Sequence, residues 1–345
     1  MRGLRKYLTP FAPDQSGAVS VLFELGGIVV ICDAGGCTGN VCGFDEPRWF
    51  EQKSAIFSAG LRDMDAILGR DDRLVAKLAD AARKVDATFA AVIGTPVPAV
   101  IATDYLALKR MSEKKINLPI LTVDTDGMEL YDKGEEKAFL ELFKTFAVEK
   151  YPIDEQKIGI IGMTPQDVSD LDATDKIRDL FQQKYGRKAV CYCMGDGLQE
   201  VKKSSSVSRN IVVSPAALAT AKYLEKTFGT PYEIYYPLVE DLIPEMDYTG
   251  KRILVVHQQV IADSIRKELL KRSTGTVQTA CWFMMKKELQ TDRDVILRDE
   301  DAYIELVQNG EFDIIFADGC MERMTPKFAG IFVDTVHFAV SGRLA

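Results

Sequence analysis

The sequence predicts an α/β protein built around parallel sheets, and three observations lead to this prediction. Short runs rich in β-branched residues alternate with amphipathic helical patterns along almost all of the 345 residues, as in stacked βαβ units. Turns rich in glycine or aspartate follow several of the expected strands. The chain is 47% hydrophobic and 27% charged, which is the balance of a globular protein long enough for two or three such units.

The first unit is expected over residues 1–150. The apolar run at 27–31 indicates a buried strand, and the spacing of Leu74, Leu78 and Ala81 gives a helix one apolar face. The elements expected in this unit are a strand at 27–31, a helix at 73–83, a strand at 89–93, a turn at 94–98, a helix that reaches 109, and a strand at 120–123.

Two further units are expected over residues 151–248 and 249–345, because each opens on an apolar strand just after a turn. The turns are Tyr151-Pro152 and the segment 247–250. The elements expected in these units are strands at 157–162, 189–193, 211–213, 251–257, 277–283 and 312–317, and helices at 173–185, 216–228 and 261–271.

Composition excludes several classes of function. A formal net charge of −8 argues against a protein that binds nucleic-acid backbones, and no apolar run is long enough to span a bilayer. The basic N-terminus has no apolar segment of a secretory signal behind it, and seven cysteines do not suit a complete disulfide framework. We therefore expect a reduced, cytoplasmic protein. With only His257 and His337, a histidine-rich metal site within one chain is excluded.

The strongest functional signal is the cysteine-containing segment after the first strand. Cys32 continues that strand, and Cys37 and Cys42 follow in a turn that also holds Gly36 and Gly39. Glycines let the backbone approach a bulky group closely, and soft thiolates at the mouth of an α/β sheet suit an iron–sulfur cluster. Cys37 is therefore a candidate cluster ligand, with Cys32 and Cys42 as further candidates. The structural alternative is a tight turn in which the cysteines pack as small apolar side chains.

The ends of the predicted strands indicate where a ligand would bind. In open α/β sheets ligands lie outside the carboxyl ends of the strands, so the loops of the three units are expected to line one central cleft. His257 ends a strand, where it is a candidate catalytic residue that donates a proton, ligates a metal or binds a substrate acid; the alternative is a structural histidine. The segment 45–49 is either a docking surface or a helix start, with Asp45 as N-cap and Pro47 in the first turn.

Segments spread over nearly the whole chain carry a family resemblance. They are residues 13–20, Gly36-Cys37, 61–74, Gly94 with Thr103-Asp104, 157–162, 228–232 and 336–341. Together they resemble the nitrogenase component 1 type oxidoreductases, which include the nitrogenase MoFe protein subunits and the catalytic component of dark-operative protochlorophyllide reductase. The reductive cyclase that makes the nickel tetrapyrrole of methanogens also belongs there. Segments 45–49 and 336–341 resemble a subgroup of that family from anaerobic bacteria.

The resemblance implies three Rossmann-like domains with parallel sheets around a central cleft, and a dimer with itself or with a paralogous subunit. It implies an electron-accepting reductase subunit supplied by an ATP-dependent iron–sulfur reductase like the nitrogenase Fe protein. An iron–sulfur cluster of the 4Fe-4S type near the subunit interface would relay electrons to a substrate or cofactor in the cleft, with Cys37 as a ligand. The chain has no Walker A sequence, so ATP hydrolysis would take place on the partner.

The chain departs from the family pattern at two ligand positions. There is no cysteine near Gly94, and Asp14 stands where an N-terminal ligand often lies; a carboxylate ligates one cluster in a relative, so Asp14 is a candidate substitute. Three explanations stay open: Cys32 and Cys42 complete an unusual set, the cluster bridges subunits through Cys37 of each, or the cluster is lost or held mostly by another chain. The alternative functions are a non-catalytic scaffold, a metal-cluster or tetrapyrrole-binding protein of the same fold, and a plain α/β binding module.

Overall fold

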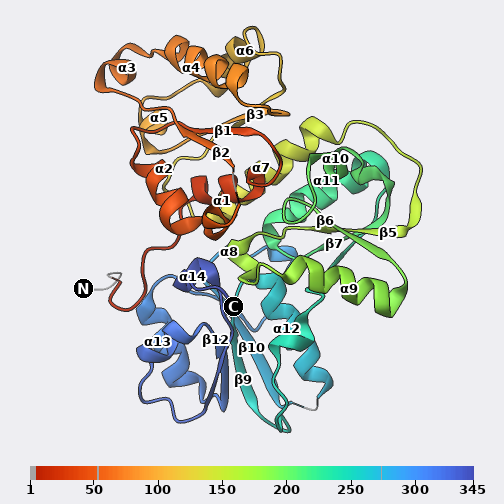
Figure 1. The fold of residues 1–345 in the computed structure, drawn as a ribbon. Helices are drawn as coiled ribbons and strands as arrows, with labels where there is room; N and C mark the ends of the chain where they lie inside the picture. Colours follow the sequence, from red (N-terminus) through yellow and green to blue (C-terminus); the bar gives the residue numbers. More distant parts are fainter. Residues whose placement is uncertain (1–4, 53, 273) are drawn as a thin grey trace.

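The computed structural model describes residues 5–52, 54–272 and 274–345, and it confirms the α/β class (Figure 1). Three parallel sheets, of four, four and five strands, follow one another along the chain. Each sheet lies within one of the three expected segments, and the boundaries at 150 and 248 themselves stay predictions. Among the described residues no helix is long and apolar enough to cross a membrane.

The first sheet has the order β2-β1-β3-β4. Its strand β1 is buried throughout, and Ile28 is in register with Ala55 of β2 and Ala90 of β3. Burial on both faces explains why the sequence of β1 is an unbroken apolar run. The elements of this unit are α1 (Asp14–Leu22), β1 (Ile28–Ile31), α2 (Gly36–Asn40), η1 (Val41–Asp45), η2 (Pro47–Phe50), β2 (Ala55–Ser58), α3 (Asp63–Leu68), α4 (Asp71–Lys84), β3 (Ala90–Ile93), α5 (Pro96–Val100), α6 (Tyr105–Glu113), β4 (Ile120–Val123) and α7 (Tyr131–Phe146).

The second sheet, of order β6-β5-β7-β8, and the third, of order β11-β10-β9-β12-β13, are parallel as well. The elements of the second unit are β5 (Asp154–Ile161), α8 (Pro165–Val168), α9 (Ala173–Tyr185), β6 (Lys188–Cys191), α10 (Leu198–Lys202), η3 (Ser204–Ser206), β7 (Val207–Val212), η4 (Pro215–Ala217), α11 (Leu218–Phe228), β8 (Tyr232–Ile234) and η5 (Val239–Leu242). Those of the third are β9 (Arg252–Val256), α12 (Gln259–Lys271), β10 (Thr276–Cys281), η6 (Lys287–Leu289), β11 (Asp294–Ile296), α13 (Glu300–Gly310), β12 (Ile314–Ala317), η7 (Gly319–Met324), β13 (Ile331–Asp334) and α14 (Phe338–Ser341).

The segment after β1 corrects one expectation. Where the sequence indicated a glycine-rich turn, the chain forms the short helix α2, which continues into the π-helical turn η1. Asp33 stabilises the start of this segment, because its carboxylate accepts hydrogen bonds from the Thr38 backbone N–H (2.7 Å) and the Thr38 hydroxyl (3.0 Å). A short acidic side chain that satisfies free N–H groups is a known device for starting a helix.

The expectation that Asp45 caps the next helix is also wrong by one residue. Glu46 is the cap of the 3₁₀ turn η2, and its side chain accepts a hydrogen bond from the backbone N–H of Arg48 (3.1 Å). Pro47 stands in the first turn as expected. Asp45 therefore does not cap η2, and its carboxylate accepts hydrogen bonds from Ser16 and Asn40 instead.

Helices α1 and α7, which the sequence did not predict, pack at backbone distance. A Cβ atom on Gly17 would lie 1.9 Å from the carbonyl oxygen of Tyr131, and one on Gly134 would lie 1.7 Å from that of Asp14. Only glycine allows this approach at either position. The two helices thereby bring the start of the chain against the start of α7, where all three units meet.

The hydrophobic cores join the units into one body. One buried cluster contains Leu22 and Phe139 from the first unit and Val190 and Leu224 from the second. Another contains Phe11 near the N-terminus together with residues of the third unit. Apolar burial of this kind is the main favourable contribution to folding, so the units are expected to unfold together.

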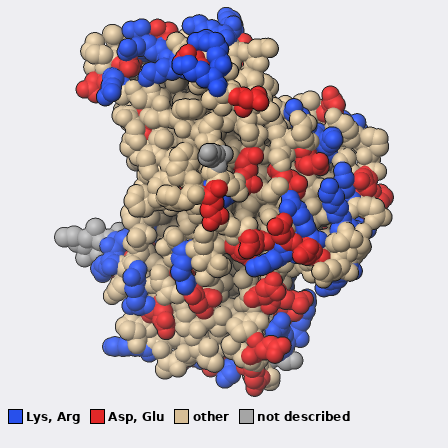
Figure 2. Space-filling view, viewed as in Figure 1, with Lys and Arg blue, Asp and Glu red and all other residues tan. Residues whose placement is uncertain are grey.

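A weakly charged face covers α2 and α5, at the left of the upper unit in Figure 2. Exposed apolar side chains follow the carboxyl ends of all four strands of the first sheet, and among them Phe44 is 77%, Val100 85% and Met128 82% exposed. The set, called the apolar face below, consists of Phe44, Met64, Ile67, Leu68, Val97, Val100, Ile101 and Met128. Exposed apolar side chains that gather at one end of a sheet are typical of an interaction site.

Candidate functional site

A cleft of ≈ 660 Å³ opens where the three units meet, and of the residues after the predicted strands it includes those that follow β1 and β5. Its walls come from the N-terminal segment, from α2 and η1, from α8, and from α14 with the residue after it. The lining residues are Thr9, Pro10, Phe11, Ala12, Pro13, Asn40, Phe44, Asp45, Gln166, Phe338, Ala339, Val340, Ser341 and Gly342. The volume of the cleft and its mixture of polar and apolar lining residues are typical of a small-molecule site.

Asp45 supplies the charged side chain of the cleft wall. One carboxylate oxygen, Oδ2, accepts hydrogen bonds from the Ser16 hydroxyl and from the Asn40 side chain, each at 2.7 Å. Burial raises the pKa of Asp45, and those two donors partly offset the shift. The second oxygen, Oδ1, has no protein partner among the described residues, so it is available to a ligand.

Gln166 forms a buried part of the same wall. Its amide Nε2 donates a hydrogen bond of 2.5 Å to the backbone carbonyl of Asp45, and its Oε1 has no partner among the described residues although the side chain is 0% exposed. Sequence reasoning missed Gln166; the signal was its place two residues after Thr164, in the segment that follows strand β5 and forms α8. A buried, unsatisfied amide oxygen costs free energy unless something donates to it.

Cys37 and Cys42 lie on the same α2–η1 segment that walls the cleft. Both are partly buried, and both pack their inner sides against the core of the first unit. Burial, followed by the charge of Asp33, raises the pKa of the Cys37 thiol, and burial with Glu46 raises that of Cys42. Gly36 and Gly39 are exposed, and a Cβ atom at either would meet nothing within 4 Å. This side of the segment is therefore open to a bulky group or another chain.

Two other predicted ligands are placed differently. Cys32 is 2% exposed within an apolar cluster, where burial raises the pKa of its thiol to about 12. The Asp14 carboxylate is fully buried and accepts hydrogen bonds from the backbone N–H groups of Asp126 (2.9 Å) and Gly127 (2.7 Å). Neither position offers a free ligand atom at the surface where Cys37 and Cys42 lie. Within the described ranges no three His, Cys, Asp or Glu side chains gather as a metal site.

His257 is buried and is not among the residues that line the cleft. It is 3% exposed, and its ring stacks on that of His337 with centroids 4.1 Å apart. Its Nδ1 accepts a hydrogen bond from the backbone N–H of Gln258 (2.8 Å), so Nε2 carries the proton and faces the Val336 carbonyl at 3.4 Å. Burial and the neighbouring His337 hold the pKa of His257 well below its ordinary value. A catalytic role for His257 stays a prediction, and no contact with the cleft supports it.

A buried polar cluster surrounds the two histidines where the units join. The Tyr131 hydroxyl donates to Asp167 (2.5 Å) and lies 3.3 Å from Nε2 of His337. These residues come from α7, α8 and the C-terminal segment, so the cluster ties all three units together. Tyr131 and Asp167 were not predicted, because nothing in either sequence neighbourhood identifies partners that lie 36 and 206 residues from Tyr131.

Asp132, next to this cluster, gives a pH-dependent prediction. Burial raises its pKa to about 6, although the Met284 backbone N–H donates to it (2.5 Å). Asp132 keeps its proton in the folded protein up to a higher pH than in the unfolded chain, where its pKa is near 3.9. Its contribution to stability is therefore fully present below about pH 3.9 and is lost as the pH rises toward 6. We expect Asp132→Asn to raise the free energy of unfolding by roughly 1–3 kcal/mol at pH 8 and by much less at pH 4.5. Urea unfolding at both pH values tests this; a gain that does not depend on pH contradicts it.

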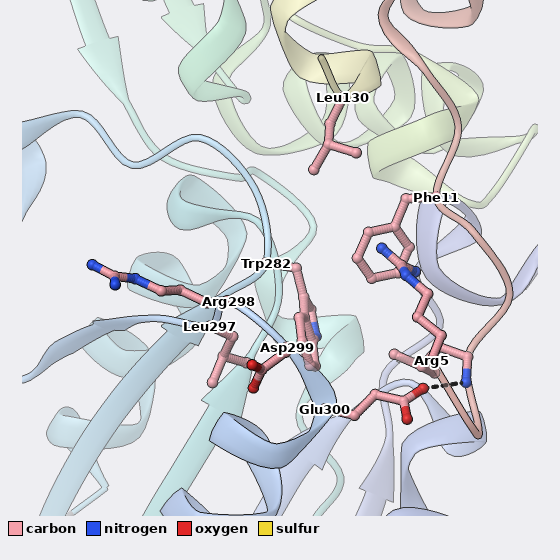
Figure 3. Close-up of a pocket in the computed structure, with 9 residues that line it drawn as sticks. Arg5, Phe11, Leu130, Trp282, Leu297, Arg298, Asp299 and Glu300 are labelled. Atoms are coloured by element: carbon pink, nitrogen blue, oxygen red, sulfur yellow. Dashed lines mark hydrogen bonds between the residues drawn. The ribbon is translucent and has the colours of Figure 1, made fainter. Parts of the chain in front are cut away.

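The N-terminal segment 6–13, called the strap below, forms one edge of the cleft and is anchored by Glu300. The Glu300 carboxylate accepts hydrogen bonds from the backbone N–H groups of Lys6 (2.7 Å), Tyr7 (2.9 Å) and Leu8 (2.8 Å). Figure 3 shows this carboxylate at the start of α13, pointing toward the strap beside Trp282. Burial alone would raise the pKa of Glu300, but the three N–H donors outweigh it, and the pKa lies below its ordinary value.

We expect Glu300→Gln to release the strap. Hydrogen bonds to a charged group contribute about 1.5–3 kcal/mol each, so the amides of residues 6–8 should exchange with solvent at least tenfold faster. Hydrogen–deuterium exchange measures this directly, and Glu305→Gln, an exposed carboxylate of the same helix α13, is the matched control. Unchanged protection of residues 6–8 in Glu300→Gln would show that other contacts hold the strap.

Comparisons with known proteins agree with this arrangement. The structure described as "Nitrogenase Cp1 at pH 6.5" superposes with a TM-score of 0.72 at 11% identity, covering 97% of this chain and 87% of that one. "Nitrogenase Cp1 at pH 5" gives 0.69 at 13% identity, covering 98% and 85%. Identities this low show the fold alone, and a comparison with curated proteins finds no match. Residues 14–242 match the profile of the family described as "Nitrogenase component 1 type Oxidoreductase", so the chain belongs to that family.

Proposed function

We propose that this protein is the electron-accepting subunit of a nitrogenase-like reductase. Electrons come from an ATP-dependent iron–sulfur reductase, pass through an iron–sulfur cluster held by Cys37, and reach a small molecule or cofactor in the cleft. The observation that carries the proposal is the position of the α2–η1 segment. It holds Cys37 and Cys42, it borders the apolar face through Phe44, and it lines the cleft through Asn40 and Asp45.

The thiols of one chain fit half of a cluster. A 4Fe-4S cluster takes four thiolates, and Cys37 and Cys42 are the partly exposed cysteines of this segment. Two protomers that meet at the open side of α2 would supply four, which favours the explanation of a cluster shared between subunits. Such a cluster, when bound, supplies one-electron transfer at low potential. The chain's own part is to hold the thiolates and to keep the surrounding glycine backbone open to the group.

The apolar face gives the partner subunit a place to bind. Its residues follow the ends of all four strands of the first sheet, and Figure 2 shows few charged residues at the left of this unit. Fully buried centres of permanent interfaces are apolar and poor in charge. We therefore assign this face to a second protomer, identical or paralogous, whose own α2 meets this one.

A mixing experiment tests the proposal. Reduced ATP-dependent iron–sulfur reductase, added anaerobically with MgATP, is expected to be oxidised when this protein is present, which raises its visible absorbance. No such rise is expected when ATP is replaced by ADP. Val100→Glu, on the apolar face, should weaken the dimer and this oxidation together, because a charge would be buried in an apolar contact. Val148→Glu, an exposed valine outside that face, is the control. Oxidation that is absent with the wild type in its iron-loaded state contradicts the proposal.

A non-catalytic scaffold of the same fold is the second candidate. One observation favours it. Among the described residues that line the cleft, Asp45 alone has an ionisable side chain, so the cleft itself has few groups that could donate a proton. A scaffold would hold iron and sulfide but would not oxidise the reductase in an ATP-dependent manner. The same mixing experiment therefore separates the two functions.

A further inference from the structure

We propose that the strap is a lid of the cleft and that Glu300 is its latch. Residues 9–13 of the strap form one edge of the cleft, so the position of the strap decides how wide the cleft is. The inference rests on the proposed function in one respect, since it names how the same site opens to a ligand. Its support is separate, because it comes from the way in which the strap is attached to the rest of the protein.

The end of the strap at residues 6–8 is attached through side chains. The buried Glu300 carboxylate accepts the three backbone hydrogen bonds described above, and hydrogen bonds to a charged group are the strong ones. Two further contacts lie at the surface: the Arg323 guanidinium donates to the Tyr7 carbonyl, and Lys6 lies 3.8 Å from Asp301. Exposed ionic contacts contribute little, so Glu300 is the main attachment of this end.

The other end of the strap is attached through the backbone. The Ala12 carbonyl accepts a hydrogen bond of 2.9 Å from the backbone N–H of Tyr131, at the start of α7. Pro13 pairs with Leu130 in an isolated antiparallel bridge. This end is continuous with the packing of α1 on α7, so it is the fixed point about which the strap moves.

The middle of the strap, residues 9–11, is not hydrogen-bonded to another segment among the described residues. Its one hydrogen bond is local, from the Arg5 guanidinium to the Thr9 carbonyl (2.6 Å). Thr9 and Pro10 are exposed, so Phe11 is the side chain that holds this stretch against the protein. A segment with few hydrogen bonds to its surroundings opens at lower free energy than a core strand or helix.

Phe11 stands between the cleft and a smaller cavity of ≈ 90 Å³, and it lines both. Figure 3 shows Phe11 projecting from the strap toward Trp282, with the Arg5 side chain alongside. The ring centroids of Phe11 and Trp282 are 5.8 Å apart, and Phe283 is at 4.9 Å. A side chain beside a void lacks part of the contacts of a close-packed core, so Phe11 holds the strap loosely. When Phe11 moves with the strap, the cleft and the cavity become one space.

An opening strap serves a reductase in two ways. It admits a ligand that the closed cleft is too narrow to take, and on closing it excludes water from the bound ligand. Lids that act in this way are common in enzymes, and their opening is often slower than the chemistry.

A cysteine placed in the cleft wall measures how often the strap opens. Ala339 lines the cleft, is 6% exposed, and belongs to the same buried cluster as Leu8, Phe11 and Ala12 of the strap. Ala339→Cys is treated with fluorescein maleimide, a bulky thiol reagent, and the labelled peptide is quantified by mass spectrometry, which separates it from the native cysteines. Ala82→Cys, at a partly buried position of α4 in the first unit, is the reference.

Glu300→Gln is expected to make the labelling of Ala339→Cys at least roughly tenfold faster, in step with the exchange of the amides of residues 6–8. Glu305→Gln should leave the labelling rate unchanged. Ala82→Cys should react at one rate in all three backgrounds, because opening of the strap is local. Unchanged labelling of Ala339→Cys in Glu300→Gln overturns the inference. An equal acceleration at Ala82→Cys also overturns it, because the whole chain would then be opening.

A second measurement keeps Glu300 intact. N-ethylmaleimide has the same chemistry as the bulky reagent and is much smaller, so a closed strap should hinder it less. The ratio of its labelling rate to that of fluorescein maleimide should be much larger at Ala339→Cys than at Ala82→Cys. Equal ratios would show that the strap does not restrict the cleft and would overturn the inference. No readout uses iron or electron transfer, so this inference and the proposed function fail separately.

Discussion

A Cys37→Ser variant is expected to lose most of its iron and its ATP-dependent electron uptake while keeping its fold. Cys37 is partly exposed on α2 and packs partly against the buried cluster, and a serine there has nearly the same size and shape. A serine hydroxyl is a poor substitute for a soft thiolate, and removal of even outer contacts of a metal site lowers affinity about 10- to 100-fold. Iron and acid-labile sulfide per protomer, measured after anaerobic purification, check the loss.

Two further variants make that result specific. Cys42→Ser should reduce iron in the same direction, because it stands on the same segment. Cys320→Ser, a partly buried cysteine of the third unit, should leave iron content and thermal midpoint unchanged. Full iron content in Cys37→Ser would remove Cys37 from the ligand set and return α2 to a purely structural role.

Arg48→Met is expected to destabilise the protein by about 3–5 kcal/mol, the range found when one partner of a buried ion pair is removed. The guanidinium is fully buried, donates to both oxygens of Glu46 (each 2.7 Å) and to Glu24 (2.8 Å), and also reaches the Ser20 carbonyl (2.7 Å). Burial alone would lower the pKa of Arg48, but Glu46 and Glu24 outweigh it and raise the pKa. Without the arginine, two carboxylates stay behind with no cation.

The effect should extend to both units that the network joins. Glu24 also accepts a hydrogen bond of 2.7 Å from Gly195, which belongs to the second unit. Urea unfolding checks the magnitude, and Arg178→Met, which breaks a more exposed pair with Asp196, should cost about 1 kcal/mol or less. If Arg48→Met lowered the free energy of unfolding no more than Arg178→Met does, the prediction would be wrong. Structural relaxation or water would then satisfy the carboxylates of Glu46 and Glu24.

Local patterns were sufficient to predict most of the fold. The alternation of apolar runs and helical faces gave the parallel sheets, and α9 occupies the predicted 173–185 because its periodicity is strong and Gly186 ends it in the left-handed region. Helix α1 was missed because it lies in an apolar stretch of sequence that continues toward β1. In such a stretch the spacing of apolar residues does not distinguish a buried helix from a buried strand. Gly17 and Gly134 serve the contact between α1 and α7, and no local pattern reveals such a partner.

The site was predictable only where its residues are close in sequence. The α2–η1 segment was singled out by Cys37. Its helical form was not foreseen, because the Asp33 carboxylate that binds the Thr38 N–H lies outside the helix, before the glycines that indicated a turn. Arg48 belongs to the segment interpreted as either a docking surface or a helix start, and its ion pairs were not predicted, because a lone arginine in a sequence does not identify its carboxylate partners. Gln166 belongs to the cleft because α8 places it against Asp45, which is a tertiary relation.

The most direct test of the central claim is the iron and sulfide content of anaerobically purified protein, together with its EPR spectrum. A cluster shared between two protomers predicts about four irons and four sulfides per dimer, with a signal that appears on reduction. Protein that stays colourless and iron-free after reconstitution with iron and sulfide would contradict the claim and leave the cleft as the site of a binding protein.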